Sequence, residues 1–328
     1  MYKKISKLTI FFSLLALLVA GCATKPTTST PALTKIKLPM GYIPNVQYAP
    51  FYVAVEKGYF AAEGLEIEFD YKFETDGVAL VGANELPFSV VSAEQVLLAR
   101  AQGLPVVYFL AWAHDYPVSI VVKSSSNIQT LQDLKGHKIG LPGMFGASYV
   151  GARALLNAAG LKESDVTLES IGFNQVEALA TDQVDAVVVY DNNEPVQLKA
   201  RGIDVRTFPV REYVRMASNG IITNEKTIAE NPKLVQGFTN AFLKGLSDTL
   251  GNPDEAFEIS KKFIPEFKES EAAIQRDVLT ASLTYWKASK AGLSDPSAWE
   301  NMQNTLLDMG MLTSQVDVNK AFTNQFIP

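Results

Sequence analysis

KLPMGYIPNVQYAPFYVAVEKGYFAAEGL, residues 37–65, sets a dense group of aromatic and amide side chains between a short apolar strand and a helix. Gly and Pro residues early in the stretch are typical of a turn. The apolar run that follows ends at Gly58 and is typical of a helix. Its aromatic residues fit the buried face of that helix. The turn and helix start carry side chains that fit either the core or contact with a flat organic ligand: Tyr42, Asn45, Gln47 and Tyr48.

Outward from this stretch, the chain alternates predicted strands and helices. Strands are predicted at residues 35–40, 65–71, 86–91, 106–111, 118–123, 138–141, 166–171, 186–190, 205–209 and 220–224. Helices are predicted at 50–58, 76–82, 93–102, 131–134, 148–159 and 174–181, and the pattern is almost wholly helical from residue 224 onward. This alternation predicts an α/β protein with open, largely parallel sheets that have helices on both faces. Such sheets bind ligands at the carboxyl ends of their strands.

The N-terminus carries a predicted export signal. Three lysines precede an apolar run from Leu8 to Ala20, which is short for a membrane span and ends in small residues, so we interpret residues 1–21 as a signal peptide. Val19-Ala20-Gly21-Cys22 resembles a bacterial lipobox, which predicts cleavage before Cys22 and acylation of its thiol, for example by palmitate. The alternative is an incidental small residue. Residues 22–33 are rich in Thr and Pro and are predicted to form a flexible tether.

Composition narrows the class of partner. The chain has 29 Lys and Arg against 35 Asp and Glu, a net charge of −6, and loss of residues 1–21 with their three lysines gives 26 − 35 = −9. An acidic body has no electrostatic attraction to nucleic acid. Cys22 is the single cysteine, so no disulfide is possible within the chain. We expect a monomeric globular body, lipid-anchored to the cell membrane and facing outside the cytoplasm.

The loops that follow predicted strands carry the side chains best suited to a ligand. Ser92 begins a helix and is either a plain N-cap or a cap that also touches ligand. Glu94 lies in the first turn of that helix, where a capping role is expected. Trp112 and Tyr116 come just past an apolar strand, where they fit either the core or a stacking platform for a ligand.

Two further loops and one return point complete the candidate set. In the Gly-rich loop 141–149, Gly146 would let the backbone approach a ligand beside Ser148 and Tyr149, but the Lys-Ser/Thr ending of a phosphate-binding P-loop is missing. After the strand 186–190, the polar run could be only a helix cap, or could offer a ring and hydrogen-bonding groups from Tyr190, Asn192 and Glu194. Asn219 lies where we expect the chain to return to its first domain.

The sequence contains no motif that predicts a metal site or a catalytic site. His114 and His137 are the only histidines, and neither has a second ligand at metal-site spacing. The sequence contains no G-x-S-x-G elbow and no HExxH motif. We therefore expect a binding protein with no metal, no cofactor and no enzymatic activity.

Four segments resemble successive landmarks of ABC-importer substrate-binding proteins: GYIPNVQYAPFYVAVEKGYFAAEGLEIEF, SVVSAEQVLLARAQGLPVV, LQDLKGHKIGLPG and ALATDQVDAVVVY. The branch is the one that includes thiamine-pyrimidine, sulfonate and nitrate binders, and the resemblance covers roughly residues 34–325. Within it, the chain is most similar to the vitamin binders of the RibY (riboflavin) and ThiY (thiamine-pyrimidine) groups. Pyrimidine binders tend to carry Trp in the opening turn, where this chain has Tyr42.

The resemblance implies a periplasmic-binding-protein-like fold of type II, with two α/β lobes joined by two hinge strands. Applied to this chain, the first lobe is residues 34–116 plus 220–328 and the second is 117–219, with hinges near 116–119 and 218–221. The candidate loops would then converge on one cleft between the lobes. The captured ligand would be delivered to a separate ABC permease and its separate ATPase.

Chemistry favours a neutral planar ligand because aromatic pairs add about 0.5–1.5 kcal/mol each beyond area burial. Riboflavin offers the largest stacking area, and a thiamine pyrimidine precursor is the alternative. Sulfonate and nitrate stay open, since helix N-termini bind anions without Lys or Arg. An enzymatic alternative is a pyrimidine-precursor synthase, but this chain lacks the cysteine-rich cluster of those relatives. A sensor that feeds a separate receptor is a third class.

Overall fold

Ten strands in three sheets build the part of the chain that the computed structural model describes, residues 32–265 and 267–328. Residues 33–328 form one compact unit. The predicted signal peptide, the lipobox with Cys22 and nearly all of the predicted tether lie outside the described residues. In the residues described, no helix combines the length and apolar character needed to cross a bilayer.

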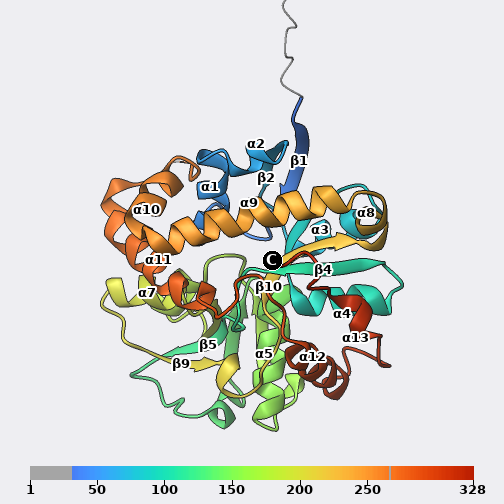
Figure 1. Cartoon of the computed structure of the whole chain (residues 1–328). Coiled ribbons are helices and arrows are strands. Elements are labelled where there is room, and N and C mark those ends of the chain that lie inside the picture. Colours follow the sequence, from blue (N-terminus) through green and yellow to red (C-terminus); the bar gives the residue numbers. More distant parts are fainter. Residues whose placement is uncertain (1–31, 266) are drawn as a thin grey trace, which may run out of the picture. The chain divides into compact units, whose positions relative to one another are not determined.

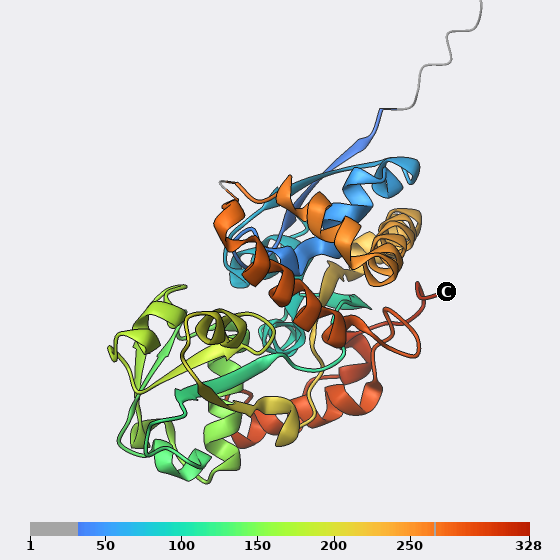
Figure 2. The same ribbon diagram turned by 90° about the vertical axis from the view of Figure 1, so that its left-hand side faces the viewer.

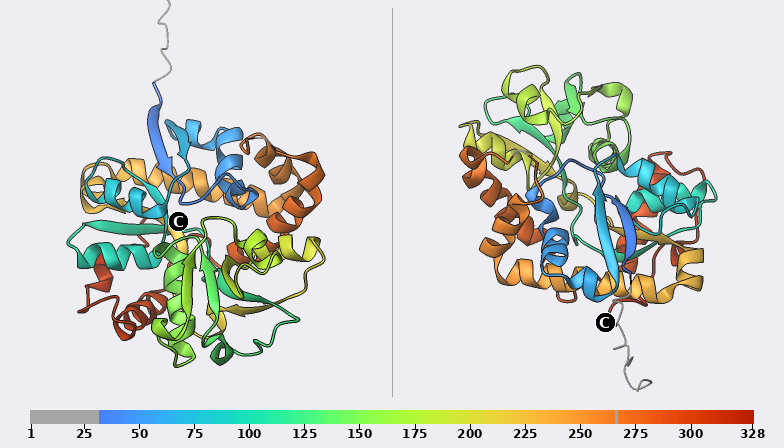
Figure 3. Two further views of the ribbon diagram at one scale, coloured as in Figure 1. Left: turned by 180° about the vertical axis from the view of Figure 1, so that it is seen from behind. Right: turned by 90° about the horizontal axis from the view of Figure 1, so that it is seen from above.

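The first lobe contains two sheets. Its strands are β1 (Thr34–Pro39), β2 (Leu65–Asp70), β3 (Ser89–Ser92), β4 (Val106–Ala111) and β10 (Asn219–Asn224). Strands β1 and β2 run side by side in parallel (Figure 3), and β10 lies between β3 and β4. Its helices are η1 (Val46–Tyr48), α1 (Ala49–Glu56), α2 (Tyr59–Ala62), α3 (Glu74–Gly82), α4 (Ala93–Ala101), α8 (Glu225–Glu230), α9 (Pro232–Gly251), α10 (Pro253–Lys261), η5 (Glu269–Glu271) and α11 (Ala272–Trp286).

The second lobe is a five-stranded sheet with helices on both faces. Its strands, in spatial order, are β7 (Thr167–Ser170), β6 (Lys138–Leu141), β8 (Ala186–Tyr190), β5 (Val118–Lys123) and β9 (Val205–Pro209). Its helices are η2 (Leu131–Leu134), α5 (Gly146–Ala158), η3 (Glu163–Asp165), α6 (Gln175–Ala180), α7 (Glu194–Ala200) and η4 (Val210–Glu212). Figure 1 shows this lobe, in green, below the first, and Figure 2 shows both from the side.

Strand β5 illustrates how the sequence sets these layers. Alternate residues of a strand point to opposite faces of a sheet. Ile120 joins the core beneath α5, whereas its neighbour Val121 joins the core beneath α6 and α7. A strand buried on both faces needs a continuous apolar run, and VSIVVK is nearly that.

The expectation of largely parallel sheets was wrong. Among the strand pairings described, three are parallel and four are antiparallel. All four antiparallel pairings involve β5 or β10, the strands that bring the chain from one lobe into the other. Such a strand enters its sheet without a crossover helix, so nothing requires it to run parallel to its neighbours. The strand predicted at 86–91 begins only at Ser89, because Pro87 has no N–H for a ladder.

The opening stretch folds largely as predicted. Phe51, Tyr52 and Phe60 are fully buried in the first-lobe core, where Phe51 packs against Phe242 of α9. Helices α1 and α9 meet closely at Gly245, where a Cβ would lie 2.2 Å from the carbonyl oxygen of Pro50. At the start of α10, the Asn252 side chain caps the helix by accepting from the Glu255 N–H.

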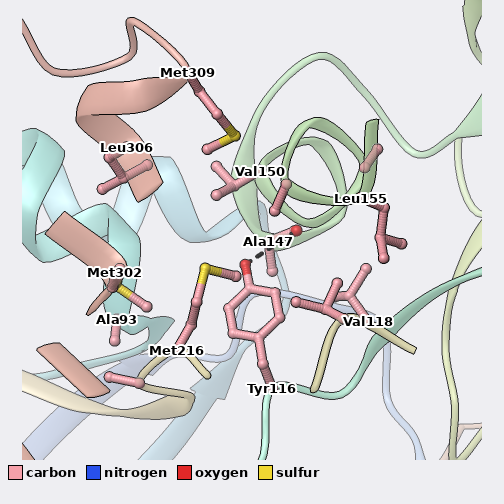
Figure 4. Packing of buried hydrophobic residues seen from close by; sticks show 14 of the residues in the cluster. Ala93, Tyr116, Val118, Ala147, Val150, Leu155, Met216, Met302, Leu306 and Met309 are labelled. Atoms are coloured by element: carbon pink, nitrogen blue, oxygen red, sulfur yellow. Dashed lines mark hydrogen bonds between the residues drawn. The ribbon is translucent and has the colours of Figure 1, made fainter. Parts of the chain in front are cut away.

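The C-terminal helices α12 (Pro296–Asp308) and α13 (Val318–Ala321) pack where the lobes meet. One core cluster runs without a break from α4 of the first lobe through α12 to α5 of the second. Tyr116 lies at its centre, close to Met216 and to Ala147, whose carbonyl accepts its hydroxyl (Figure 4). The two segments that join the lobes, which contain Tyr116 and Met216, therefore pack against this shared core.

The fold class predicted from the sequence is confirmed: two α/β lobes joined by two chain crossings. The first crossing lies between β4 and β5 and the second between β9 and β10. The residue boundaries assigned to the lobes and hinges stay a prediction, as does any motion about them.

Candidate functional site

A cavity lies between the two lobes, at the point where loops of both converge. The space between its walls is about 980 Å³ when the part open to solvent is included, and about 100 Å³ of it is wide enough to admit the centre of a water molecule. Its walls come from the turn after β1, the start of α3, the ends of β3 and β4, the Gly-rich loop before α5, the loop after β7, the loop after β8 and the end of α11.

Ten of the predicted ligand residues line this cavity. They are Tyr42, Gln47, Tyr48, Trp112, Gly146, Ser148, Tyr190, Asn192, Glu194 and Asn219. They come from five segments that are distant in sequence, so the fold brings these candidate loops together, as expected from the sequence. Their contact with a ligand stays a prediction.

The other four predicted residues lie elsewhere. The Asn45 carboxamide caps η1 by accepting from the Gln47 N–H at 2.9 Å, and it faces a separate groove. Tyr116 belongs to the core between the lobes, because its hydroxyl reaches the Ala147 carbonyl, 3.1 Å away. Tyr149 turns outward and donates to Glu163 at 2.8 Å. Ser92 is fully buried behind the wall, where it contacts two carboxylates.

The first-lobe wall is a stack of aromatic rings. The rings of Tyr48 and Trp112 are 5.4 Å apart with an interplanar angle of 21°, and Trp286 continues the stack at 6.3 Å and 25°. The Tyr48 hydroxyl donates to the Met40 carbonyl at 2.6 Å, which fixes the ring. All three side chains belong to the first-lobe core. Stacked rings of this kind present a preformed apolar surface for a flat ligand.

Polar groups from both lobes line the rest of the cavity. The Tyr190 hydroxyl accepts from Asn219 at 3.1 Å, and Asn192 donates to Ser282 of α11 at 2.8 Å. The side-chain oxygens of Asn192 and Asn219 and the indole N–H of Trp112 have no hydrogen-bond partner among the described residues, although all three are buried. Unpaired buried polar atoms in a cavity wall indicate where a ligand would form hydrogen bonds.

Glu194 is a buried carboxyl beside these groups. It accepts from the Tyr190 N–H at 2.9 Å and from the Asn193 amide at 3.0 Å. Burial raises the pKa of Glu194 to about 7, and these hydrogen bonds oppose the rise only in part. Burial, with the nearby Glu194 charge, also raises the pKa of Tyr42.

The mouth of the cavity is framed by rings from both lobes. Tyr42 meets Phe173 edge-on at 4.7 Å, and Phe73 meets Phe145 edge-on at 4.8 Å. Phe73 and Phe145 are also among the exposed large apolar residues. Each pair joins one ring of the first lobe to one of the second, so the lobes touch across the mouth.

Glu74 at the start of α3 is a wall residue that the sequence analysis missed. Its carboxylate accepts from the N–H and hydroxyl of Ser92, both at 2.8 Å, and from the Ala147 N–H at 2.9 Å. Ser92 also contacts the buried carboxyl of Glu94. Burial, followed by the Glu74 charge, raises the pKa of Glu94 to about 7. The one hydroxyl proton of Ser92 cannot be donated to two carboxylates. The hydrogen bonds among Glu74, Ser92 and Glu94 are therefore all satisfied when Glu94 is protonated and donates to the Ser92 hydroxyl.

Glu94 lies in the first turn of α4 as expected, but its side chain is wholly buried and contacts Ser92 and Gln95, so a capping role alone does not describe it. Four further residues line the cavity and were not predicted from the sequence: Tyr285 and Trp286 at the end of α11, and Phe173 and Gln175 after β7. A Trp that ends an amphipathic helix gives no signal beyond burial. The position of Phe173 just after a strand was the one usable signal.

The fold and the cavity together define a two-lobed binding protein of the periplasmic-binding-protein class. The crystal structure of the periplasmic aliphatic sulphonate binding protein SsuA from Escherichia coli has this architecture. It superposes with a TM-score of 0.70 over 88% of this chain and 92% of SsuA, at 15% identity, which shows the fold alone.

The chain belongs to the NMT1/THI5-like family, whose model matches residues 45–256. It is 40% identical to the riboflavin-binding protein RibY of Chloroflexus aurantiacus, over 99% of this chain and 98% of RibY. It is 30% identical to the formylaminopyrimidine-binding protein of Halalkalibacterium halodurans, over 75% of this chain and 76% of that protein. The family resemblance predicted from the sequence is thereby confirmed, and the chain is a substrate-binding protein of this family.

Proposed function

We propose that this protein captures riboflavin in the cavity between its lobes and delivers it to an ABC permease in the membrane. The observation that carries the proposal is the 40% identity to a riboflavin-binding protein along nearly the whole of both chains. The two relatives described above are both named as binding proteins, which supports binding rather than catalysis.

The cavity geometry supports a flat heterocycle. One wall presents the stacked rings of Tyr48, Trp112 and Trp286. Ring stacking at about 0.5–1.5 kcal/mol per pair adds to the gain from burying the ligand's apolar surface. With a few hydrogen bonds, the sum reaches the roughly 8–12 kcal/mol of micromolar to nanomolar binding.

The unpaired polar atoms support the same class of ligand. The oxygens of Asn192 and Asn219 are acceptors, and the indole N–H of Trp112 is a donor. An isoalloxazine ring has N–H and carbonyl groups along one edge, and a ribityl chain adds hydroxyl groups. These groups can pair with both kinds of wall atom, whereas a simple aromatic hydrocarbon would leave the wall atoms unpaired.

In the proposed mechanism, ligand enters between open lobes and stabilises the closed form, because only that form brings both walls against it. The closed lobes then dock on the permease. A lipid on Cys22 would keep the protein at the outer face of the membrane, near that permease. The SsuA neighbour is a periplasmic protein, which supports an extracytoplasmic location.

The first experiment is to purify residues 24–328 from a vitamin-replete host, denature the protein and record the absorbance and fluorescence of the released material. A near-stoichiometric yellow compound with green fluorescence is the expected result. If none is released, added riboflavin should still quench the tryptophan fluorescence, since Trp112 and Trp286 line the cavity. Failure of both measurements would contradict the riboflavin proposal.

A thiamine pyrimidine precursor is the second candidate. The identity to the formylaminopyrimidine-binding protein favours it, at 30% over three quarters of the chain. A pyrimidine is smaller and would cover less of the ring stack. Competitive titration separates the two candidates: formylaminopyrimidine that displaces riboflavin only at high excess supports riboflavin, and the reverse order supports the pyrimidine.

A further inference from the structure

Glu74 joins the two lobes across the cavity wall. It is the first residue of α3 in the first lobe, and one of its carboxylate oxygens accepts both donors of Ser92 in the same lobe. The other oxygen accepts from the Ala147 N–H, in the first turn of α5 in the second lobe. Three donors from two lobes thus converge on one carboxylate.

The backbone at Gly146 is shaped to let this carboxylate in. Gly146 has φ +69°, which favours glycine, and a Cβ there would lie 2.4 Å from Oε1 of Glu74. Any other residue at 146 would displace the carboxylate from the helix start. The glycine that the sequence analysis assigned to ligand approach therefore makes room for a side chain of the protein itself.

The carboxylate takes the place that an anionic ligand would seek. The first N–H groups of α5, a helix of 13 residues, carry the positive end of its dipole. Glu74 occupies one of those N–H groups and lines the cavity with a second acid, Glu194. The cavity-lining residues, all within the described ranges, include no Lys, Arg or His. Burial raises the pKa of Glu74, and the hydrogen bonds from Ser92 and Ala147 oppose that rise and favour the charged carboxylate. An anion entering this cavity would meet the Glu74 charge with no cationic side chain in the lining to offset it.

We infer that Glu74 is a specificity residue: its carboxylate acts as a built-in anion at the start of α5, so that the closed cavity accepts uncharged ligands and rejects anionic ones. Of its three hydrogen bonds, the one from the Ala147 N–H also holds the lobes together at this wall. The inference rests on the proposed function only for the choice of riboflavin as the uncharged probe.

The test compares riboflavin with riboflavin 5′-phosphate, which differ by a phosphate group. Titrations of tryptophan fluorescence would use the wild type, Glu74→Gln and Asp76→Asn. Gln keeps the shape of the side chain and can still accept from Ala147, but it carries no charge. Asp76 is an exposed acid two residues along the same helix that does not line the cavity, so it is the matched control.

The wild type and Asp76→Asn should bind riboflavin at least 100-fold more tightly than its phosphate. Glu74→Gln should reduce that preference at least 10-fold, mainly through tighter binding of the phosphate. The inference is overturned if wild type binds both flavins equally, or if Glu74→Gln keeps the preference seen in Asp76→Asn. Melting temperatures of all three proteins check that the lobes remain folded.

If neither flavin binds wild type, the proposed ligand fails and a flavin-independent measurement decides the inference. Glu74→Ala frees the N–H of Ala147 and both donors of Ser92. Methanesulfonate, added at constant ionic strength, should then raise the melting temperature of Glu74→Ala, but not that of wild type or Asp76→Ala. An equal response in all three proteins overturns the inference.

Discussion

The two walls of the cavity are built in different ways. On the first-lobe side, Tyr48 and Trp112 belong to the core, with only 4% and 7% of their surface exposed, and their rings lean on one another. On the second-lobe side, the wall consists of a Gly-rich loop and of polar groups after β8, and Tyr190 is only half-buried. The first wall is thus a fixed surface that the core holds in place. The second supplies hydrogen-bonding groups and depends on closure of the lobes.

The largest effect is expected from a substitution that disrupts the first-lobe wall. Trp112→Ala removes the central ring of the stack and leaves a void in the core. We expect riboflavin affinity to fall roughly 100-fold or more, about 3 kcal/mol. Truncation of a buried Trp also costs about 3–5 kcal/mol of unfolding free energy. Fluorescence titration and denaturant unfolding measure the two effects separately.

Trp299→Ala is the matched control. Trp299 is also fully buried, its indole N–H likewise has no partner among the described residues, and its ring stacks on Phe322 at 5.2 Å, but it does not line the cavity. Its truncation should cost similar stability while riboflavin affinity stays within about twofold. An equal loss of affinity in both variants would show that the Trp112 effect is one of folding and not of the wall.

The next effect concerns the charge of the second wall. Burial raises the pKa of Glu194 to about 7 from an ordinary value of 4.5, so the folded protein keeps a proton that the unfolded chain releases within that window. The contribution of Glu194 to stability is therefore full below about pH 4.5 and declines as pH rises towards 7, by about 3 kcal/mol at most. Glu194→Gln cannot titrate and should remove this decline.

Melting temperatures of wild type and Glu194→Gln between pH 4.5 and 8 test this directly. The difference between the two proteins should move in favour of Glu194→Gln as pH rises, because the variant avoids the penalty of a buried charge. Glu94 contributes a decline of the same sign in both proteins and cancels in the comparison. Parallel melting curves across the range would mean that Glu194 ionises as freely in the folded as in the unfolded chain.

The two walls also differ in how far the sequence predicts them. The turn at Tyr42–Tyr48 and the loop at Tyr190–Glu194 were identifiable because turn-forming and polar residues interrupt apolar runs directly after strands. Trp286 was not, because a Trp at the end of a long helix has the pattern of a core residue. Sequence periodicity gives faces of strands and helices but no strand direction, which is why β5 and β10 were misjudged.

Glu74 shows a further limit. It lies in FETDG, a polar segment that reads as an ordinary helix start, where an acidic residue favours the dipole of its own helix. The contact from which we infer its role is instead the hydrogen bond from the N–H of Ala147, 73 residues away in the other lobe. Pairings of this kind depend on how two lobes close, and local sequence patterns carry no information on that.

The smallest expected effect concerns the place where the two walls meet, at the contact between Glu74 and the start of α5. Gly146 and Gly160 have nearly equal φ values, +69° and +70°, so Ala at either should cost roughly 1–2 kcal/mol of unfolding free energy from backbone strain. A Cβ at 160 meets nothing within 4 Å, whereas one at 146 meets the Glu74 carboxylate. We therefore expect Gly146→Ala to lose about 1 kcal/mol more than Gly160→Ala in denaturant unfolding.

That excess should vanish when Glu74 is also Ala, because the obstacle is then gone. A double-mutant cycle over Glu74→Ala and Gly146→Ala measures this coupling. Coupling near zero would mean that the lobes adjust around a Cβ at little cost, and that the contact between Glu74 and α5 is loose. Strong coupling would mean that the contact between Glu74 and the start of α5 is rigid. The second wall would then be held in the closed form as firmly as the first wall is held by its stacked rings.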